Sequence, residues 1–179
     1  RIRLFNDHKI LVSFDGTNTE LAYGRAKTIY HTDRLKNRIA TAAFTQRYLE
    51  DFLSYDEDWL VKLDADVKVF DTIIPPKFNG IAAHFSFPEF RPRAWACSMS
   101  SAIFSADRAS VKKIVDSKLL IDDKFLANLA KNKYQDKKLD KVIFTLGIPL
   151  LRFIPYLISD KLSDITPETM VYHRLTSKT

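Results

Sequence analysis

Two carboxylates separated by one small residue, Asp64 and Asp66, follow directly after the apolar run of residues 59–63. This run, Trp-Leu-Val-Lys-Leu, has the length and the β-branched and aromatic content of a buried strand, and Asp is a poor strand residue. We therefore expect the strand to stop at Asp64, with both carboxylates at the carboxyl edge of a sheet, where open α/β folds bind ligands. Two carboxylates there could hold a divalent cation and so bind a diphosphate. The plain alternative is a strand that ends in a solvated acidic turn.

A second acidic pair, Asp122 and Asp123, opens a predicted helix over residues 124–132. Acidic side chains in the first turn of a helix are favoured by the helix dipole without any function. The pair is therefore either a candidate for proton transfer or an ordinary helix start.

Two further segments carry polar residues at the ends of predicted elements. Asp15 ends a short apolar strand, and a long amphipathic helix is predicted over residues 32–53. Lys36, Asn37 and Arg38 lie in its first turns, near the positive end of the helix dipole, where a phosphate or a base could bind. The alternative is that they are solvated residues of the polar face.

In this order, the segments resemble the GT-A class of nucleotide-sugar glycosyltransferases, and most of all the inverting family of cellulose- and chitin-synthase type. The resemblance covers roughly residues 9–135. In that family a strand ends in Val-Asp-Asp-Gly-Ser, a helix carries Arg or Lys and Asn, a strand ends in Asp-X-Asp, and a small-residue segment leads to an acidic pair. The counterparts here are residues 10–20, 32–53, 59–66, 94–104 and 122–123.

The resemblance implies a single α/β domain of the GT-A (Rossmann-like) type over residues 1–179, with a mixed, mostly parallel sheet flanked by helices. The family places a further strand and helix before its Val-Asp-Asp-Gly-Ser strand, and only about nine residues precede Ile10. Either the chain is a fragment or the match is trimmed at the front. Because the family's first strand contacts the nucleotide base, we expect an incomplete donor site.

The resemblance also implies a cofactor and a donor. Mn²⁺ or Mg²⁺ would bridge the diphosphate of a nucleotide-sugar donor, with a UDP-sugar favoured. Asp66 would coordinate the metal, and Asp64 would contact the metal or its bound water and the donor ribose. Asp15 would hold the base or the ribose, and Asn37 and Arg38 would complete the donor contacts.

The remaining implied roles concern a third metal ligand and a base. Many GT-A enzymes use a histidine near the carboxyl end of the catalytic domain, and His173 is the counterpart here, although a lone histidine is often an ordinary residue. The family's acidic pair supplies the general base that takes the acceptor's hydroxyl proton. Asp123 is then the base and Asp122 the fallback. His84, at the end of another apolar run, is a candidate without an assigned role.

The charge of the chain suggests an anionic partner. The net charge is +6 with a pI near 9.3, and lysine is dense over residues 112–141. The acceptor could therefore be a glycan or another anionic polymer, nucleic acid included. The alternative is a solvated basic surface that keeps the protein in solution.

The cysteine content and the apolar segments of the sequence indicate in which compartment the protein is expected. The single Cys97 excludes an intramolecular disulfide and fits a reducing compartment, and no signal peptide is visible at the start, so we expect a cytoplasmic protein. The apolar stretch of residues 142–158 is interrupted by Pro149 and Pro155 and is too short for a transmembrane segment.

Three functions compete on these grounds, and the first is favoured. They are a metal-dependent inverting glycosyltransferase, a nucleotidyltransferase, and a non-catalytic basic binding module on the same scaffold. A nucleotidyltransferase usually carries a glycine-rich phosphate loop near its start, and this sequence has none. Retaining chemistry also stays open, because retaining GT-A enzymes share the metal motif and need no general base.

Overall fold

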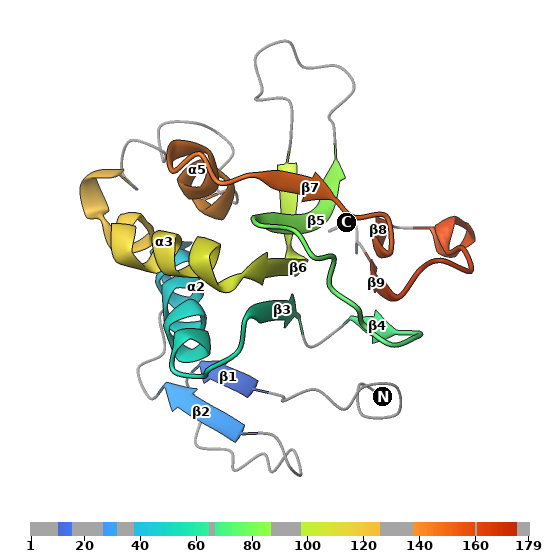
Figure 1. Ribbon diagram of the computed structural model, residues 1–179, viewed down its shortest axis with the longest axis horizontal. Coiled ribbons are helices and arrows are strands. Elements are labelled where there is room, and N and C mark those ends of the chain that lie inside the picture. The colour runs from blue at the N-terminus through green and yellow to red at the C-terminus, as the bar shows by residue number, and fades with distance from the viewer. Residues whose placement is uncertain are drawn as a thin grey trace. The chain divides into compact units, whose positions relative to one another are not determined.

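The computed structural model describes residues 11–15, 27–31, 38–64, 67–86, 98–125, 138–159 and 161–174. These residues form a mixed α/β fold, as the sequence predicts. The strands are β1 (Leu11–Asp15), β2 (Lys27–His31), β3 (Trp59–Leu63), β4 (Lys68–Val69), β5 (Ile81–Ser86), β6 (Ser98–Asp107), β7 (Leu150–Arg152), β8 (Tyr156–Ser159) and β9 (Val171–Arg174) (Figure 1). The helices are α2 (Arg38–Leu53), α3 (Arg108–Ser117) and α5 (Lys138–Thr145), with 3-10 turns η1 (Leu119–Ile121) and η2 (Leu162–Asp164).

The described chain divides into two compact units, each built from segments that are distant in sequence. Unit 1 takes its residues from Trp59–Ser110 and Ile148–Thr179, and unit 2 from His8–Asp58 and Val111–Gly147. That the chain forms one domain remains a prediction.

Unit 1 contains two mixed sheets. One has the strand order β3-β6-β5-β7 and the other β4-β9-β8. Their inward side chains share one core cluster, because alternate residues of a strand point to the same face. The cluster consists of Val69, Ile73, Ala102, Ile103, Tyr156, Ile158 and Val171, with Val61 and Leu63 of β3 packed against it. The turn from β3 to β4 therefore links two sheets that share a core.

Gly80 fixes the start of β5 in unit 1. A Cβ atom at this position would lie 2.4 Å from the carbonyl oxygen of Pro149 and 2.6 Å from the ring of Phe78. The close approach lets the amide of Ile81 donate a hydrogen bond to Pro149 at 2.9 Å. Any side chain at residue 80 would separate β5 from the segment that begins β7.

Unit 2 contains the parallel pair β1-β2, the helices α2 and α5, and α3 from Val111 onward. In α3, Val111, Ile114 and Val115 are buried while Lys112 and Lys113 are exposed, as in an amphipathic helix. The helix predicted over residues 32–53 is observed as α2 from residue 38; residues 32–37 lie outside the described chain.

The buried face of α2 is more polar than the sequence predicts. Ala42, Leu49 and Phe52 are buried, whereas Ala43 and Leu53 are half-buried, and Gln46 is buried as well, at 2% exposure. Its amide nitrogen donates to the carbonyl of Val115 at 3.2 Å and to Glu50 at 2.8 Å. Hydrogen bonds thus satisfy the amide nitrogen, whereas the amide oxygen is buried without a hydrogen-bond partner among the described residues.

The predicted preference for parallel pairing is not seen among the described strands. Three pairings are parallel, β1-β2, β5-β7 and β8-β9, and three are antiparallel, β3-β6, β5-β6 and β4-β9. The apolar stretch of residues 142–158 forms the end of α5, a turn, β7 and part of β8. Within the described ranges, no helix has the length and apolar character needed to cross a membrane.

Candidate functional site

The acidic turn after β3 is the first part of the candidate site, and it lies in unit 1. β3 ends at Leu63, as the sequence predicts, and the amide of Asp64 still donates to Ala102 of β6 at 2.9 Å. The side chain of Asp64 is 43% exposed, and one of its oxygens contacts the ammonium of Lys62. The backbone thus fixes Asp64 at the end of the strand while its carboxylate remains open to solvent.

Strand β9 runs beside the segment that leaves this turn. The amide of Val67 donates to the carbonyl of Asp64 at 3.3 Å, so a single turn leads from Asp64 into β4. In the antiparallel pair β4-β9, Lys68 lies opposite Tyr172. Continuing this register by one residue brings Val67 opposite His173. The topology therefore places His173 next to the acidic turn, although the two are more than 100 residues apart in sequence.

The described part of this turn offers one carboxylate, that of Asp64, whose oxygens are of the kind that a divalent cation prefers. Lys62 contacts one of these oxygens, and no other described residue forms a pair with the carboxylate. Asp66 lies outside the described residues, as does the side chain of His173. Among the side chains that are described, no three His, Cys, Asp or Glu residues come together as a metal site.

The second acidic pair lies in unit 2, and its two carboxylates have different surroundings. Asp122 follows η1, and its Oδ1 accepts the backbone N–H groups of Lys124 at 2.8 Å and Phe125 at 3.1 Å. This is an N-cap, the ordinary structural use of Asp at a helix start. Asp123 is exposed in the first helical turn, and its carboxylate has no partner among the described residues. Asp123 is thus the carboxylate of the pair that is available for proton transfer.

The predicted donor contacts are described only in part. Asp15 is the last residue of β1, in register with His31 at the end of β2, as expected for a residue at a strand end. Arg38 is the first residue of α2. Asn37 lies outside the described residues, as do the side chains of Asp15 and Arg38. Their roles at a donor remain predictions.

His84 belongs to a small polar cluster in unit 1. Its Nδ1 lies 3.1 Å from the carbonyl oxygen of Tyr156, and a carbonyl can only accept, so Nδ1 carries the hydrogen and Nε2 is the basic nitrogen. Burial lowers the pKa of His84 and the charge of Arg152 adds to this effect, whereas the hydrogen bond that the imidazole donates to the Tyr156 carbonyl opposes it. The imidazole is therefore neutral near pH 7.

The phenol of Tyr156 takes no part in proton transfer. Burial raises the pKa of Tyr156 to about 12, and the nearby hydroxyl of Ser105 opposes this shift only weakly. Both hydroxyls are fully buried and make no well-formed hydrogen bond to a described residue. The phenol therefore remains protonated at physiological pH.

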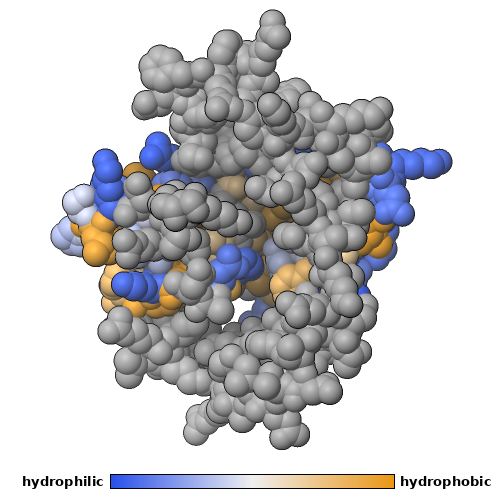
Figure 2. Space-filling model, turned by 180° about the vertical axis from the view of Figure 1, so that it is seen from behind, coloured by the Kyte–Doolittle hydropathy of each residue, from blue (hydrophilic) through white to orange (hydrophobic). Residues whose placement is uncertain are grey.

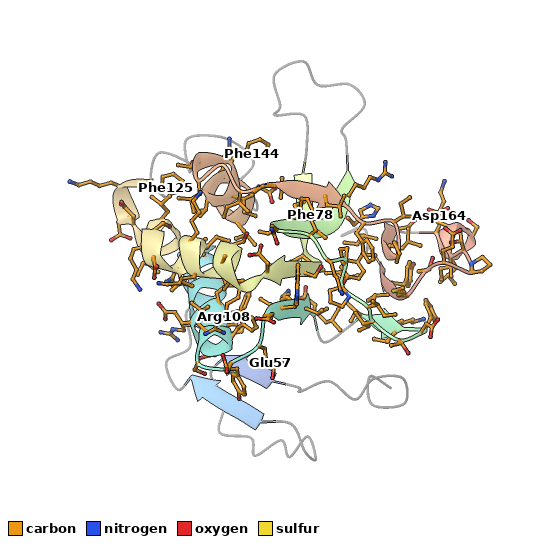
Figure 3. All side chains as sticks on the ribbon, in the orientation of Figure 1. Glu57, Phe78, Arg108, Phe125, Phe144 and Asp164 are labelled. Atoms are coloured by element: carbon orange, nitrogen blue, oxygen red, sulfur yellow. The ribbon has the colours of Figure 1, made fainter. Side chains whose placement is uncertain are left out.

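Other carboxylates of unit 1 are held by neutral groups. Asp107 caps α3 by accepting the amide of Ser110 at 3.0 Å, and Asp164 on η2 accepts the hydroxyl of Ser159 (Figure 3). Asp64 differs, because its partner is the ammonium of Lys62. No role is predicted for Lys62 from the sequence, although its position two residues before Asp64, on the same face of a strand, is a pattern that could indicate one.

Part of the lysine-rich segment is neutralised by neighbouring acids in unit 2. Lys112 pairs with Asp116 at 2.5 Å, and Lys118 pairs with Glu50 at 3.1 Å. Hydrophilic and hydrophobic residues alternate in small groups over the described part of the face in Figure 2. These two lysines are therefore paired with acids, and an anionic acceptor stays a prediction.

Comparison with known proteins adds no relative: no family model matches this chain, and no curated protein matches it either.

Proposed function

We propose that this protein is a metal-dependent glycosyltransferase that moves a sugar from a nucleotide-diphosphate donor to a hydroxyl acceptor. One observation carries the proposal. Asp64 ends β3 with an exposed carboxylate, and the next strand, β4, pairs with the strand that carries His173. This strand pairing supports a shared role for the end of β3 and for β9, two segments that are distant in the sequence.

Asp64, Asp66 and His173 would hold Mn²⁺ or Mg²⁺ at this turn. The cation supplies positive charge where negative charge develops on the leaving nucleoside diphosphate. Carboxylate oxygens suit both cations, and an imidazole suits Mn²⁺ better than Mg²⁺. We therefore favour Mn²⁺ as the working cofactor, with a UDP-sugar as the donor.

Asp123 would remove the acceptor's hydroxyl proton, as an inverting mechanism requires. Its carboxylate is exposed and unengaged among the described residues, whereas Asp122 is bound to two backbone amides. Protonation of Asp122 during base catalysis would weaken the hydrogen bonds that hold this helix start. Asp15, Asn37 and Arg38 would contact the base, ribose or phosphate of the donor.

Thermal unfolding with and without ligands tests this function. Nucleoside diphosphates and UDP-sugars are added with Mn²⁺ or Mg²⁺, and each mixture is repeated with EDTA. A ligand at about 100 times its Kd stabilises by about 2.7 kcal/mol, which raises the Tm of a chain of this size by roughly 5–10 °C. We expect this shift with one nucleotide only when metal is present. No shift with any donor, or an equal shift in EDTA, contradicts the proposal.

A further inference from the structure

The glycosyltransferase resemblance gives no role to Lys62, which precedes Asp64 by two residues. It lies in β3 opposite Phe104 of β6, and its side chain is only 16% exposed. Its ammonium nevertheless reaches the carboxylate of Asp64, on the same face of the strand two residues further on. A lysine that is largely buried is uncommon unless it is paired, and here the partner is the predicted metal ligand.

The burial of Lys62 makes its charge effective. Exposed ion pairs are weakened by water and salt, whereas a charge with little solvent around it acts on its neighbours through a lower effective dielectric. A divalent cation that binds Asp64 must therefore approach an ammonium group at close range. Its binding is opposed by repulsion from Lys62 and by the loss of the Lys62–Asp64 pair.

A bound nucleoside diphosphate would offset this electrostatic repulsion between Lys62 and the cation. The two predicted carboxylate ligands, one ammonium and one divalent cation leave a single positive charge at the turn. The diphosphate carries the negative charge that offsets it, and its oxygens can accept hydrogen bonds from the ammonium once Lys62 leaves Asp64. Metal and diphosphate should therefore bind much better together than either does alone.

We propose that Lys62 is a positioning residue that couples metal binding at Asp64 to binding of the donor diphosphate. In the free protein its ammonium contacts one oxygen of the Asp64 carboxylate, and its positive charge keeps the metal affinity low. With the diphosphate present, Lys62 transfers its contact to the phosphate oxygens, and both oxygens of the carboxylate become available to the metal. This inference rests on the proposed function, and it adds a condition for metal binding. The metal binds tightly only when the nucleotide is bound as well.

Calorimetric titrations with Mn²⁺ and UDP test the coupling. Mn²⁺ affinity is measured for the whole chain without UDP and at saturating UDP, in the wild type, Lys62→Met and Lys62→Arg. We expect Lys62→Met to bind Mn²⁺ about tenfold more tightly than the wild type does when UDP is absent. The factor by which saturating UDP increases the Mn²⁺ affinity should be about tenfold smaller in Lys62→Met than in the wild type. Tenfold corresponds to about 1.4 kcal/mol of coupling. By linkage, the effect of Mn²⁺ on UDP affinity must fall by the same factor.

Two further variants make the test specific. Lys62→Arg keeps the positive charge and should therefore keep the coupling between Mn²⁺ and UDP binding. If the lysine stem had a purely structural role, the coupling would not depend on this charge. Lys112→Met removes a lysine from another lysine–aspartate pair, the exposed one with Asp116, and should change neither affinity. Lys62→Gln replaces Lys62→Met if the latter does not fold, as judged by circular dichroism.

The outcomes separate the two proposals. If the wild type binds Mn²⁺ and UDP but Lys62→Met shows the same affinities and the same coupling, the role of Lys62 is wrong and the proposed function stands. The same holds if the wild type binds both ligands without any coupling. If the wild type binds neither Mn²⁺ nor UDP, both proposals are overturned.

Discussion

Two acidic turns of this chain use the same side chain in different ways. After β3, the carboxylate of Asp64 contacts the ammonium of Lys62 and is 43% exposed. After η1, the carboxylate of Asp122 accepts two backbone N–H groups, at 2.8 and 3.1 Å. An ammonium can move to another anion, whereas the amides of a helix start cannot. The first carboxylate can therefore exchange its partner for a ligand, and the second is committed to the fold.

Acidic pairs that look alike in a sequence can therefore differ in whether their carboxylates are available to a ligand. Asp-X-Asp after a strand and Asp-Asp before a helix look equally suited to chemistry. What separates them is whether backbone donors already satisfy the oxygens. By this measure Asp64 and Asp123 are available in their own units, and Asp122 is not.

The largest expected effect is loss of the metal site. Asp66→Ala removes a predicted ligand, and since the cation supplies several kcal/mol of charge stabilisation, sugar transfer should fall at least about 100-fold. Metal-dependent stabilisation by UDP should disappear in the same variant. Asp116→Ala, which removes an exposed aspartate of unit 2 that pairs with Lys112, is the control and should leave both properties unchanged. Undiminished metal-dependent donor binding in Asp66→Ala would show that the turn after β3 is an ordinary acidic turn.

The next effect tests the difference between Asp123 and Asp122. Asp123→Asn should lower turnover by about 100-fold or more, because general-base catalysis contributes about that much, while donor binding stays intact. Asp122→Asn should keep near-normal turnover, since Asn caps a helix as well as Asp does. Near-normal turnover in Asp123→Asn would reject the base and favour retaining chemistry.

A smaller effect, on stability, tests whether Asp122 and Asp123 have structural roles. Asp122→Ala removes an N-cap and should lower the free energy of unfolding by about 1 kcal/mol, measured by denaturant titration. Asp123→Ala should change it by less than about 0.5 kcal/mol, because its exposed carboxylate has no partner among the described residues. Equal costs for the two substitutions would mean that Asp123 is structural too.

The smallest expected effect is a pH dependence that differs between the two units. In unit 1, burial lowers the pKa of His84 below its ordinary 6.5. The unfolded chain therefore binds a proton first as the pH falls, and stability is full above pH 6.5 and declines below it, down to the folded-state pKa. Thermal melts from pH 7.5 to 5.5 should show this decline. His84→Asn, which can still donate to Tyr156, should weaken it.

In unit 2 the corresponding group is Glu50. Burial raises its pKa, but hydrogen bonds from Gln46 and Lys118 outweigh burial, so the pKa lies below 4.5. This contribution to stability is present above pH 4.5 and is lost as the pH falls through the folded-state pKa. Glu50→Gln should flatten the melts in this acidic range alone. A decline there that persists in Glu50→Gln would assign it to other carboxylates.

Local patterns in the sequence predicted local structure well. The end of β3 at Asp64 and the buried face of α3 were predictable, because strand and helix periodicities and the poor fit of Asp in a strand act over a few residues. The polar interior of α2 was not. Gln46 is buried because a carbonyl 69 residues away accepts its hydrogen bond, and no local pattern encodes that partner.

The sequence alone determined where candidate carboxylates stand: Asp64 after an apolar strand and the pair Asp122 and Asp123 before a helix. The tertiary structure decided what each can do. Pairing of β4 with β9 places His173 beside the acidic turn, and side-chain contacts give Asp64 a lysine and Asp122 two amides. The physical reason is that element type follows from short-range sterics and periodicity, whereas strand partners and side-chain contacts follow from packing between distant segments of the chain.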